Sequence, residues 1–386
     1  MNRVTIRIMS YNTKKIGILG GGQLARMICH RGREMGLSIH VLSPKKTDPA
    51  ASVCKEWHQG DLNKIADIKK FAKKMDLITF ESEFIPAALL EKSFFEKSKL
   101  KKNQCFPQIS NLAKIQDRWP QKELLWDHEI PSSPFMKINS KDDLDLAFTA
   151  YDGHFVLKQR FGGYDGFGTF IIKSAIQLKQ FKLKFKGIEN HFIAEKFIPF
   201  KSEMSLLFAR NLKGQIYNYP LFTSVQKENQ CDQVFGPSAH PKQNLMVQKI
   251  QKMLTEINYV GVIAFELFNT ETDLIVNEIA PRVHNTGHIT MDAFQIDQFE
   301  LHLRCVLNLD LPTTVENASA KNYLMQNLSG TSLRRAVFLK SLSGRMHWYD
   351  KIENRPRRKM GHVNYIGDDH NRLALLAAGD KKKIRL

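Results

Sequence analysis

Two glutamates, Glu266 and Glu278, stand inside apolar runs of the segment VGVIAFELFNTETDLIVNEIAPRVHNTGH. The runs 260–268 and 274–279 are separated by NTETD, a composition typical of a turn. If they pair as a hairpin centred near Thr272, Glu266 lies opposite Glu278. Like charges across a strand pair repel, and buried carboxylates need a counter-charge. We therefore expect a magnesium ion here, since Mg²⁺ joins carboxylates to nucleotide phosphates. The alternative is one glutamate in solvent and the other paired with an arginine.

A glycine-rich loop follows a strand-like run that ends at Lys158, in HFVLKQRFGGYDGFGTFII. Such a loop can fold over a phosphate and donate backbone N–H groups to it. It is not a P-loop, because no GK[ST] follows and no helix opens after it. We interpret it as phosphate-binding, with a flexible hairpin loop as the alternative. Its glycines are Gly162, Gly163, Gly166 and Gly168.

The end of the first segment, APRVHNTGH, gathers Arg282, His284, Asn285 and His288. An arginine there suits bidentate contact with a phosphate or carboxylate. Each histidine can be structural or functional. No spacing in the chain suggests a Ser-His-Asp or Cys-His arrangement for nucleophilic catalysis.

Two kinds of folding unit have to position these residues. From Lys15 onward, strand-like KIGIL, SIHVL and DLITF alternate with helix-like segments, which predicts a parallel sheet covered by helices. After about residue 105, NLAKIQDRWPQKELLWDH predicts a helix broken at Pro120. The runs HFVLK, GTFIIK, HFIAEKF, EMSLLFAR and QIYNYPLF then predict an α+β domain with an antiparallel sheet. Beyond about residue 310, AVFLK and MHWYDK indicate a small third unit.

A glycine fingerprint opens the first unit. Gly20, Gly22 and Ala25 satisfy G-x-G-x-x-A between a strand and a helix, as in dinucleotide-binding folds. The second strand, however, closes on Ser43-Pro44 without an acidic residue to bind an adenine ribose. This argues against a nicotinamide dehydrogenase. We expect instead a helix amino terminus whose free N–H groups form a general anion site.

The composition is that of a soluble globular protein, with 42% hydrophobic and 25% charged residues. Five scattered cysteines without a CxxC pair favour a reducing compartment, and we expect a cytoplasmic protein with no membrane partner. The net charge of +18 is spread along the chain, so we do not expect nucleic-acid binding. The alternative, a basic nucleic-acid-binding module, predicts salt-sensitive retention on DNA or RNA without ATP turnover.

The motifs GGGQLARM, ITFESE, FVLKQRFGGYDGFG, NYVGVIAFELF, VNEIAPRVHNTGH and HWYDK…RRKMGHVN occur in order over nearly the whole chain. Together they resemble the 5-(carboxyamino)imidazole ribonucleotide synthetase family of the ATP-grasp superfamily. The resemblance implies α/β and α+β architecture, with a Rossmann-like domain at 15–110, an ATP-grasp domain at 111–310 and a small β-rich domain at 311–386, after an extension at 1–14. It also implies a homodimer, and the N-carboxylation of 5-aminoimidazole ribonucleotide with ATP and bicarbonate in purine synthesis. Another ATP-grasp ligase, such as formate-dependent glycinamide ribonucleotide transformylase, is the alternative.

The resemblance also assigns roles to residues that match the family motifs. Lys158 would contact ATP phosphates under the glycine loop, backbone groups of 195–198 would hold adenine, and Glu203 would bind the ribose. Mg²⁺, or Mn²⁺ in its place, would bind Glu266 and Glu278. The full ATP set is Arg118, Lys158, Gly163, Tyr164, Gly166, Gly168, Glu195, Lys196, Phe197, Ile198, Glu203, Gln226, Asn277 and Glu278.

The same resemblance implies the side of the site that takes the aminoimidazole nucleotide and bicarbonate. Asp165, Arg282 and Lys351 would act in catalysis. Substrate binding would fall to Gln23, Glu81, Tyr164, Asp165, His284, Asn285, Lys351 and Arg358. Two positions depart from the family: Phe167 replaces an arginine of the loop, and Gln226 replaces a histidine. The first change removes a cation from the loop, and the second weakens one expected nucleotide contact.

Overall fold

The structure is a computed structural model that describes residues 14–95, 104–163, 167–185, 191–313, 320–331, 337–338 and 341–385. It begins with a four-stranded sheet of order β3-β2-β1-β4, in which every pairing is parallel, as the alternating pattern predicted. The edge strand β3 was not predicted, because its sequence EWHQ lacks an apolar run. The elements are β1 (Lys15–Leu19), α1 (Gln23–Glu34), β2 (Ser38–Ser43), β3 (Glu56–Gln59), α2 (Ile65–Ala72), β4 (Leu77–Phe80) and α3 (Ala87–Phe95).

Two helices, α4 (Ile109–Gln116) and α5 (Arg118–Asp127), connect this domain to the next. The predicted break at Pro120 is wrong: the chain turns at Asp117, and Pro120 lies in the first turn of α5. A proline is tolerated there because the first-turn N–H groups have no partner within the helix. The Asp117 side chain caps α5 by accepting from the backbone N–H of Trp119 at 3.0 Å.

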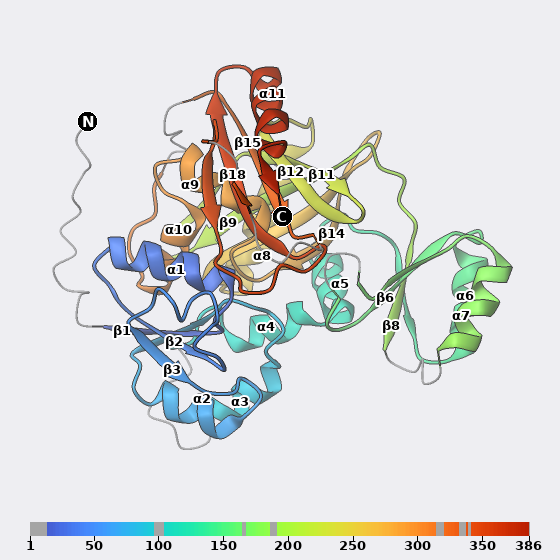
Figure 1. The fold of residues 1–386 in the computed structure, drawn as a ribbon. Coiled ribbons are helices and arrows are strands. Elements are labelled where there is room, and N and C mark those ends of the chain that lie inside the picture. Colours follow the sequence, from blue (N-terminus) through green and yellow to red (C-terminus); the bar gives the residue numbers. More distant parts are fainter. Residues whose placement is uncertain are drawn as a thin grey trace.

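A separate lobe, on the right of Figure 1, carries a second four-stranded sheet. Its order is β5-β8-β6-β7, and all its pairings are antiparallel. The apolar core between this sheet and its two helices includes Phe155, Leu157 and Phe192, all buried. The elements are β5 (Phe135–Ile138), α6 (Lys141–Ala150), β6 (Phe155–Gln159), β7 (Thr169–Ile172), α7 (Ala175–Lys184) and β8 (Phe192–Lys196).

A nine-stranded sheet forms the centre of the molecule. Its order is β14-β13-β9-β11-β12-β15-β18-β17, with β10 paired to β9. The predicted strand QIYNYPLF is divided in two, because Pro220 falls between the pieces. The strands are β9 (Ser202–Arg210), β10 (Ile216–Asn218), β11 (Leu221–Lys227), β12 (Gln230–Ser238), β13 (Gly261–Asn269), β14 (Leu274–Ala280), β15 (Asn322–Ser329), β17 (Arg345–Trp348) and β18 (Lys359–Gly367).

The carboxy-terminal unit continues this sheet, because β15 pairs with β12. Figure 1 shows its strands, in red and orange, beside the yellow strands of the central domain. Helix α10 packs against β9 and β13, and α11 packs against β15 and β18. A small pair of strands, β16 (Val337–Phe338) and β19 (Ile384–Arg385), is antiparallel. The remaining helices are α8 (Gln243–Glu256), α9 (Thr290–Ala293), α10 (Gln298–Val306) and α11 (His370–Lys381).

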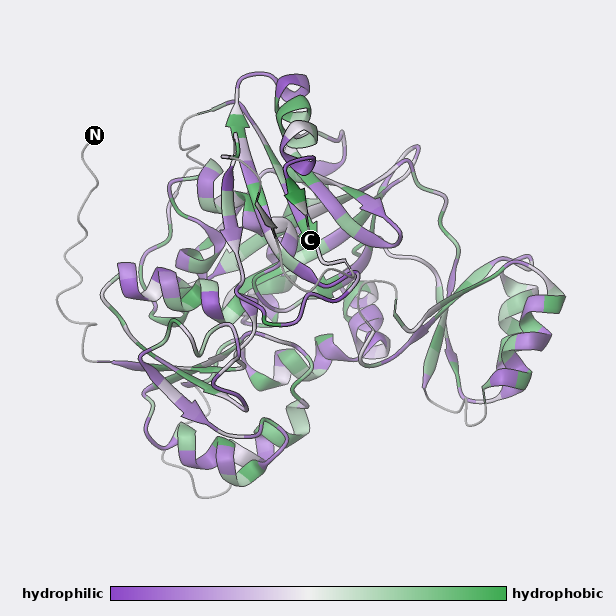
Figure 2. Ribbon diagram, viewed as in Figure 1, coloured by the Kyte–Doolittle hydropathy of each residue, from purple (hydrophilic) through white to green (hydrophobic). Residues whose placement is uncertain are grey.

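Hydrophobic residues alternate with polar ones along the helices in Figure 2, as expected for helices that cover sheets. The largest core joins the first domain to the central sheet through residues such as Ile28, Leu207 and Leu303. Among the described residues, none of the helices has the length and apolar character needed to cross a bilayer.

Candidate active site

The β13–β14 hairpin places Glu266 directly opposite Glu278, which confirms the pairing predicted from the NTETD turn. Each carboxylate has a nitrogen-bearing neighbour: His284 Nε2 lies 3.2 Å from Glu266 Oε1, and Arg118 Nη2 lies 2.8 Å from Glu278 Oε2. The two glutamate side chains remain 31% and 33% exposed. Burial raises the pKa of Glu266, but the His284 hydrogen bond and the charges of Lys359 and Arg282 together outweigh burial, so the net pKa is lowered. The two carboxylates are therefore cross-strand neighbours, and both remain partly exposed.

Lys158, at the end of β6, bridges the lobe and the central sheet. Its Nζ donates to Asn277 Oδ1 at 2.7 Å and to Glu195 Oε2 at 3.2 Å. Asn277 precedes Glu278 in β14, so Lys158 stands beside the carboxylate pair. Such an arrangement suits a phosphate bound together with a metal ion, because the cation can contact the phosphate while the carboxylates hold the metal.

Lys122 in α5 belongs to the same cluster and was not predicted. It is 1% exposed, and its Nζ lies 3.1 Å from Glu195 Oε2 and 3.0 Å from Ser133 Oγ. Burial raises the pKa of Glu195, but Lys122 and Lys158 outweigh it and lower that pKa to about 2. Burial lowers the pKa of Lys122 to about 8, and the like charge of Lys158 acts in the same direction. Two lysines thus share one carboxylate, leaving excess positive charge for an anion.

Glu203 in β9 stands beside the carboxylate pair on the next strands. It is the cross-strand partner of Phe268, and its carboxylate accepts a hydrogen bond from the Gln226 amide. Burial raises the pKa of Glu203 to about 7, with the negative charges of Glu266 and Glu278 adding to the effect. The glutamine found in place of the family's histidine therefore contacts the residue predicted to bind the ribose.

The segment predicted to hold adenine leaves β8 and runs back to the central sheet. The Phe197 ring stacks on the His154 ring with centroids 4.0 Å apart. The backbone N–H of Phe197 donates a hydrogen bond to the His154 carbonyl. Lys196 is exposed and Ile198 half-buried. Glu195 contributes a buried ion pair, a contact that the predicted backbone role did not include.

The glycine loop begins close to the same cations. The Gly163 carbonyl accepts from Arg118 Nη2 at 3.4 Å, and the Gly168 carbonyl accepts from the Gln159 N–H at 2.8 Å. Phe167, which replaces the family's arginine, is 71% exposed. Tyr164, Asp165 and Gly166 lie outside the described residues.

The amino terminus of α1 differs from the expected free anion site. The Glu81 carboxylate, from the loop after β4, accepts from the backbone N–H groups of Gly22 and Ala25. A Cβ on Gly20 would lie 2.5 Å from Glu81 Cγ, so this glycine is needed for the close approach as well as for its φ of +114°. Burial raises the pKa of Glu81, although the two N–H groups oppose it. The expectation that these N–H groups are free is therefore wrong for the two that Glu81 occupies.

Three chain segments meet beside Glu81. Lys351 donates to the Gln23 side chain and to the Lys359 carbonyl, which joins the carboxy-terminal unit to α1. Arg282 makes a bidentate ion pair with Glu83, which was not predicted. Burial raises the pKa of Glu83, but Arg282 outweighs burial and lowers it. The predicted substrate residues Gln23, Glu81 and Lys351 and the predicted catalytic residue Arg282 are thus brought together.

The other predicted substrate residues are placed less uniformly. His284 is held at Glu266, and its Nδ1 lies 3.0 Å from Thr286 Oγ1. Asn285 exchanges side-chain hydrogen bonds with Asn327 of β15. Arg358 donates to the Glu353 carbonyl at 3.0 Å within its own loop.

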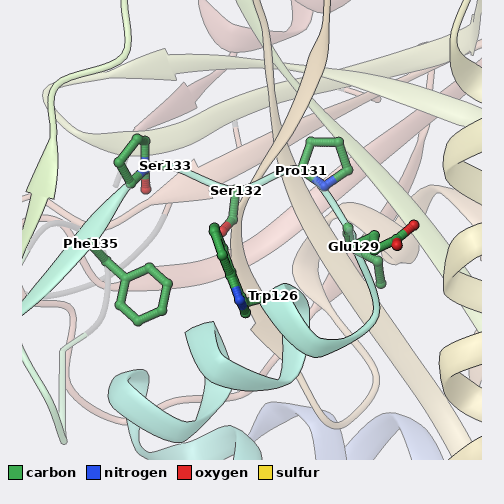
Figure 3. A pocket seen from close by; sticks show the side chains of 8 residues that line it. Trp126, Glu129, Pro131, Ser132, Ser133 and Phe135 are labelled. Atoms are coloured by element: carbon green, nitrogen blue, oxygen red, sulfur yellow. The ribbon is translucent and has the colours of Figure 1, made fainter.

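A cavity of about 360 Å³ lies where α5 and the connector to β5 meet (Figure 3). Trp126, Pro131, Ser132 and Phe135 are among the residues that line it. None of the predicted site residues lines this cavity. The candidate active site is therefore the charged convergence described above.

Comparison with protein families covers three stretches of the chain. Residues 13–116 match the ribonucleotide synthetase preATP-grasp domain, and residues 123–299 match the ATP-grasp domain. Residues 324–375 match the phosphoribosylaminoimidazole carboxylase C-terminal domain. The predicted sequence of three units is confirmed, whereas their predicted limits stay predictions.

Individual relatives are similar over the same span. The chain is 34% identical over 357 residues to the N5-carboxyaminoimidazole ribonucleotide synthase of Synechococcus elongatus, covering 90% of this chain and 88% of the relative. It is 32% identical to that of Saccharolobus solfataricus, over 92% of each chain. The crystal structure of N5-carboxyaminoimidazole synthetase from Staphylococcus aureus complexed with ADP has a TM-score of 0.85 at 29% identity, covering 95% of this chain and 97% of that one.

Proposed function

Because the chain belongs to the N5-carboxyaminoimidazole ribonucleotide synthase family, we propose that it carboxylates 5-aminoimidazole ribonucleotide using ATP and bicarbonate. The products are 5-carboxyaminoimidazole ribonucleotide, ADP and phosphate, in purine biosynthesis. The observation that carries this proposal is the convergence of Lys158, Asn277, Glu278 and Arg118 in one charged cluster. That cluster has both the cations for a polyphosphate and the carboxylates for its metal ion.

The donor set fits Mg²⁺. Glu266 and Glu278 face one another across the hairpin and offer carboxylate oxygens, the ligands that Mg²⁺ and Mn²⁺ prefer. A metal bound there would neutralise phosphate charge during phosphoryl transfer. Arg118 pairs with Glu278 and His284 contacts Glu266, so each carboxylate is also held by a neighbouring side chain.

The chain's own residues position ATP. Lys158 contacts the phosphates, the buried Lys122 shares the Glu195 carboxylate with it, and Arg118 holds the carbonyl of Gly163 at the base of the loop. Backbone groups of 195–198 hold adenine, and Glu203, oriented by Gln226, binds the ribose hydroxyls. Phosphoryl transfer needs little beyond such positioning and charge neutralisation.

A bicarbonate oxygen then attacks the γ-phosphorus, the bond from that phosphorus to the bridging oxygen breaks, and ADP leaves. The carboxyphosphate formed, or the CO₂ it releases, is captured by the exocyclic amine, which loses a proton as phosphate departs. Arg282 and Lys351 stand where the three units meet, so they can hold the anionic carboxyl group and the nucleotide phosphate. The roles of all these site residues stay predictions, those of Tyr164, Asp165 and Arg358 included, as does the homodimer.

An ADP-release assay tests the proposal. We expect ADP release to require both 5-aminoimidazole ribonucleotide and bicarbonate, and the carboxylated nucleotide to form in equal amount. Formate with glycinamide ribonucleotide, supplied to the same preparation, tests the transformylase alternative. ATP turnover that is indifferent to the aminoimidazole nucleotide would overturn the proposal.

A further inference from the structure

Two histidines and a glutamate meet at the outer edge of the first domain's sheet. His40 lies in β2, and Glu56 and His58 lie in the edge strand β3. In the parallel register His40 pairs with Glu56, and His58 pairs with Leu42, two residues after His40. The three side chains therefore lie on one face of the two strands and close together. One ligand atom from each residue lies within 4.8 Å of the others.

The spacing of one ring nitrogen from each histidine is that of two ligands on one ion. His40 Nδ1 and His58 Nε2 lie 3.2 Å apart. Two nitrogens bound to a tetrahedral Zn²⁺ at about 2.0–2.1 Å are separated by about 3.3 Å, so both rings already stand at the required spacing. The Glu56 side chain is exposed and can rotate to bring a carboxylate oxygen to the same ion.

The surroundings orient the buried ligand. The other ring nitrogen of His40, Nε2, lies 3.1 Å from Ser38 Oγ. Such an outer partner fixes the tautomer of a metal-binding histidine and leaves the opposite nitrogen for the ion. The edge of the His58 ring packs against Phe71 of α2, with centroids 5.2 Å apart. Burial lowers the pKa of both histidines, so they are in the neutral form that binds metals at neutral pH.

The geometry points to a metal site formed by His40, Glu56 and His58, which takes one divalent transition ion of the Zn²⁺ class and leaves a fourth position to solvent. Two imidazoles and a carboxylate favour Zn²⁺, Co²⁺ or Ni²⁺ over Mg²⁺. The three residues lie on β2 and edge strand β3, and β3 is two strands from β1 and three strands from β4, the strands that Gln23 and Glu81 follow. The ion would therefore tie edge strand β3 to β2 without entering the reaction.

The test is a Zn²⁺ titration of the full chain without a polyhistidine tag, stripped of metal and saturated with Mg²⁺ and ADP to occupy the catalytic carboxylates. A competing chromophoric chelator reports affinity. We expect one strong site per chain, and a visible Co²⁺ spectrum of the four-coordinate kind. We also expect Zn²⁺ to raise the melting temperature.

The variants His58→Gln and Glu56→Gln should each weaken Zn²⁺ binding by about tenfold or more, and Ser38→Ala by about tenfold through the orientation of His40. The matched controls His30→Gln and Glu34→Gln, on α1 of the same domain, should leave binding unchanged. ADP release should be unaffected in all of them. If His58→Gln lowers the melting temperature without metal, its effect on Zn²⁺ binding could come from a change in folding. Glu56→Gln then provides the test of the site, because the Glu56 side chain is exposed and its substitution disturbs no buried packing.

Two results would overturn the site. One is an absence of Zn²⁺ binding by the wild-type chain, which would leave only an N–H···N hydrogen bond between the rings. The other is binding of equal strength in the wild type, His58→Gln and Glu56→Gln, which would place the ion elsewhere.

Discussion

Two pairs of carboxylates in this molecule differ in how their charge is met. Glu81 and Glu83 follow β4 and are held by the chain itself: Glu81 by backbone N–H groups of α1, and Glu83 by the guanidinium of Arg282. Glu266 and Glu278 face each other across a hairpin, with one contact each, to His284 and to Arg118, and about a third of each side chain exposed. The first pair fixes how the chain segments meet, whereas the second keeps lone pairs available for a bound ion.

The two residues of the first pair differ from each other as well. The pKa of Glu81 is raised, because burial outweighs two neutral N–H donors. The pKa of Glu83 is lowered, because a full positive charge outweighs burial. Hydrogen bonds from backbone dipoles and a bidentate arginine thus have opposite net results at nearly the same depth in the molecule.

Glu278→Gln has the largest expected effect on activity. The amide keeps a similar shape but removes the charge that binds the metal, so we expect ADP release to fall by roughly two to three orders of magnitude. The control is Glu271→Gln in the turn of the same hairpin, whose side chain is 79% exposed. Steady-state ADP release at several Mg²⁺ concentrations provides the measurement. Wild-type turnover in Glu278→Gln would show that the hairpin pair is structural, like Glu81 and Glu83.

The contrast between these pairs also marks what could be predicted from the sequence. The hairpin could be predicted, because a turn composition and two short apolar runs set its register locally. The partners of Glu81 could not be predicted from the sequence. Gly22 lies 59 residues earlier in the chain, and only the parallel sheet brings Gly22 and Glu81 together. The predicted anion site at α1 failed for this reason: periodicity identifies a helix end, but not the distant side chain that caps it.

Lys122 shows the same limit inside the predicted ATP site. It lies in a helix among ordinary polar residues, and its partner Glu195 is in a strand of the lobe. Nothing in its local sequence distinguishes it from a solvent-exposed lysine. A buried lysine becomes visible only when tertiary packing removes water from it.

Glu83→Gln should lower stability. Removing one partner of a buried ion pair costs about 3–5 kcal/mol, and we expect about 2 kcal/mol because the two side chains are 17% and 21% exposed. The pKa of Glu83 is lower in the folded state, so this contribution is complete above the unfolded pKa and is lost as pH falls through the folded one. The difference in the free energy of unfolding between Glu83→Gln and the wild type, measured with urea, should therefore become smaller as the pH is lowered below about 4.5.

The control for that variant is Glu91→Gln on α3, whose side chain is exposed. It should change the free energy of unfolding by less than about 0.5 kcal/mol. A gap between Glu83→Gln and wild type that is independent of pH would contradict the role given to the Glu83–Arg282 charge pair.

The smallest expected effect is a proton released from Glu203 when the hairpin pair binds its metal. Burial, together with the charges of Glu266 and Glu278, raises the pKa of Glu203 to about 7, so near neutral pH a substantial fraction is protonated. Since the unfolded side chain ionises near 4.5, the free protein should lose stability as pH rises from about 4.5 to 7. A metal ion beside Glu266 and Glu278 lowers the Glu203 pKa, so binding of Mg²⁺ and ADP at pH 6.5 should release a fraction of a proton. Calorimetry in two buffers of different ionisation enthalpy measures that fraction, which should disappear in Glu203→Gln and persist in Glu271→Gln. Equal proton release in all three proteins would show that the pKa of Glu203 does not respond to the metal. The charges of Glu266 and Glu278 would then not influence Glu203, just as the charge of Glu83 is neutralised by Arg282.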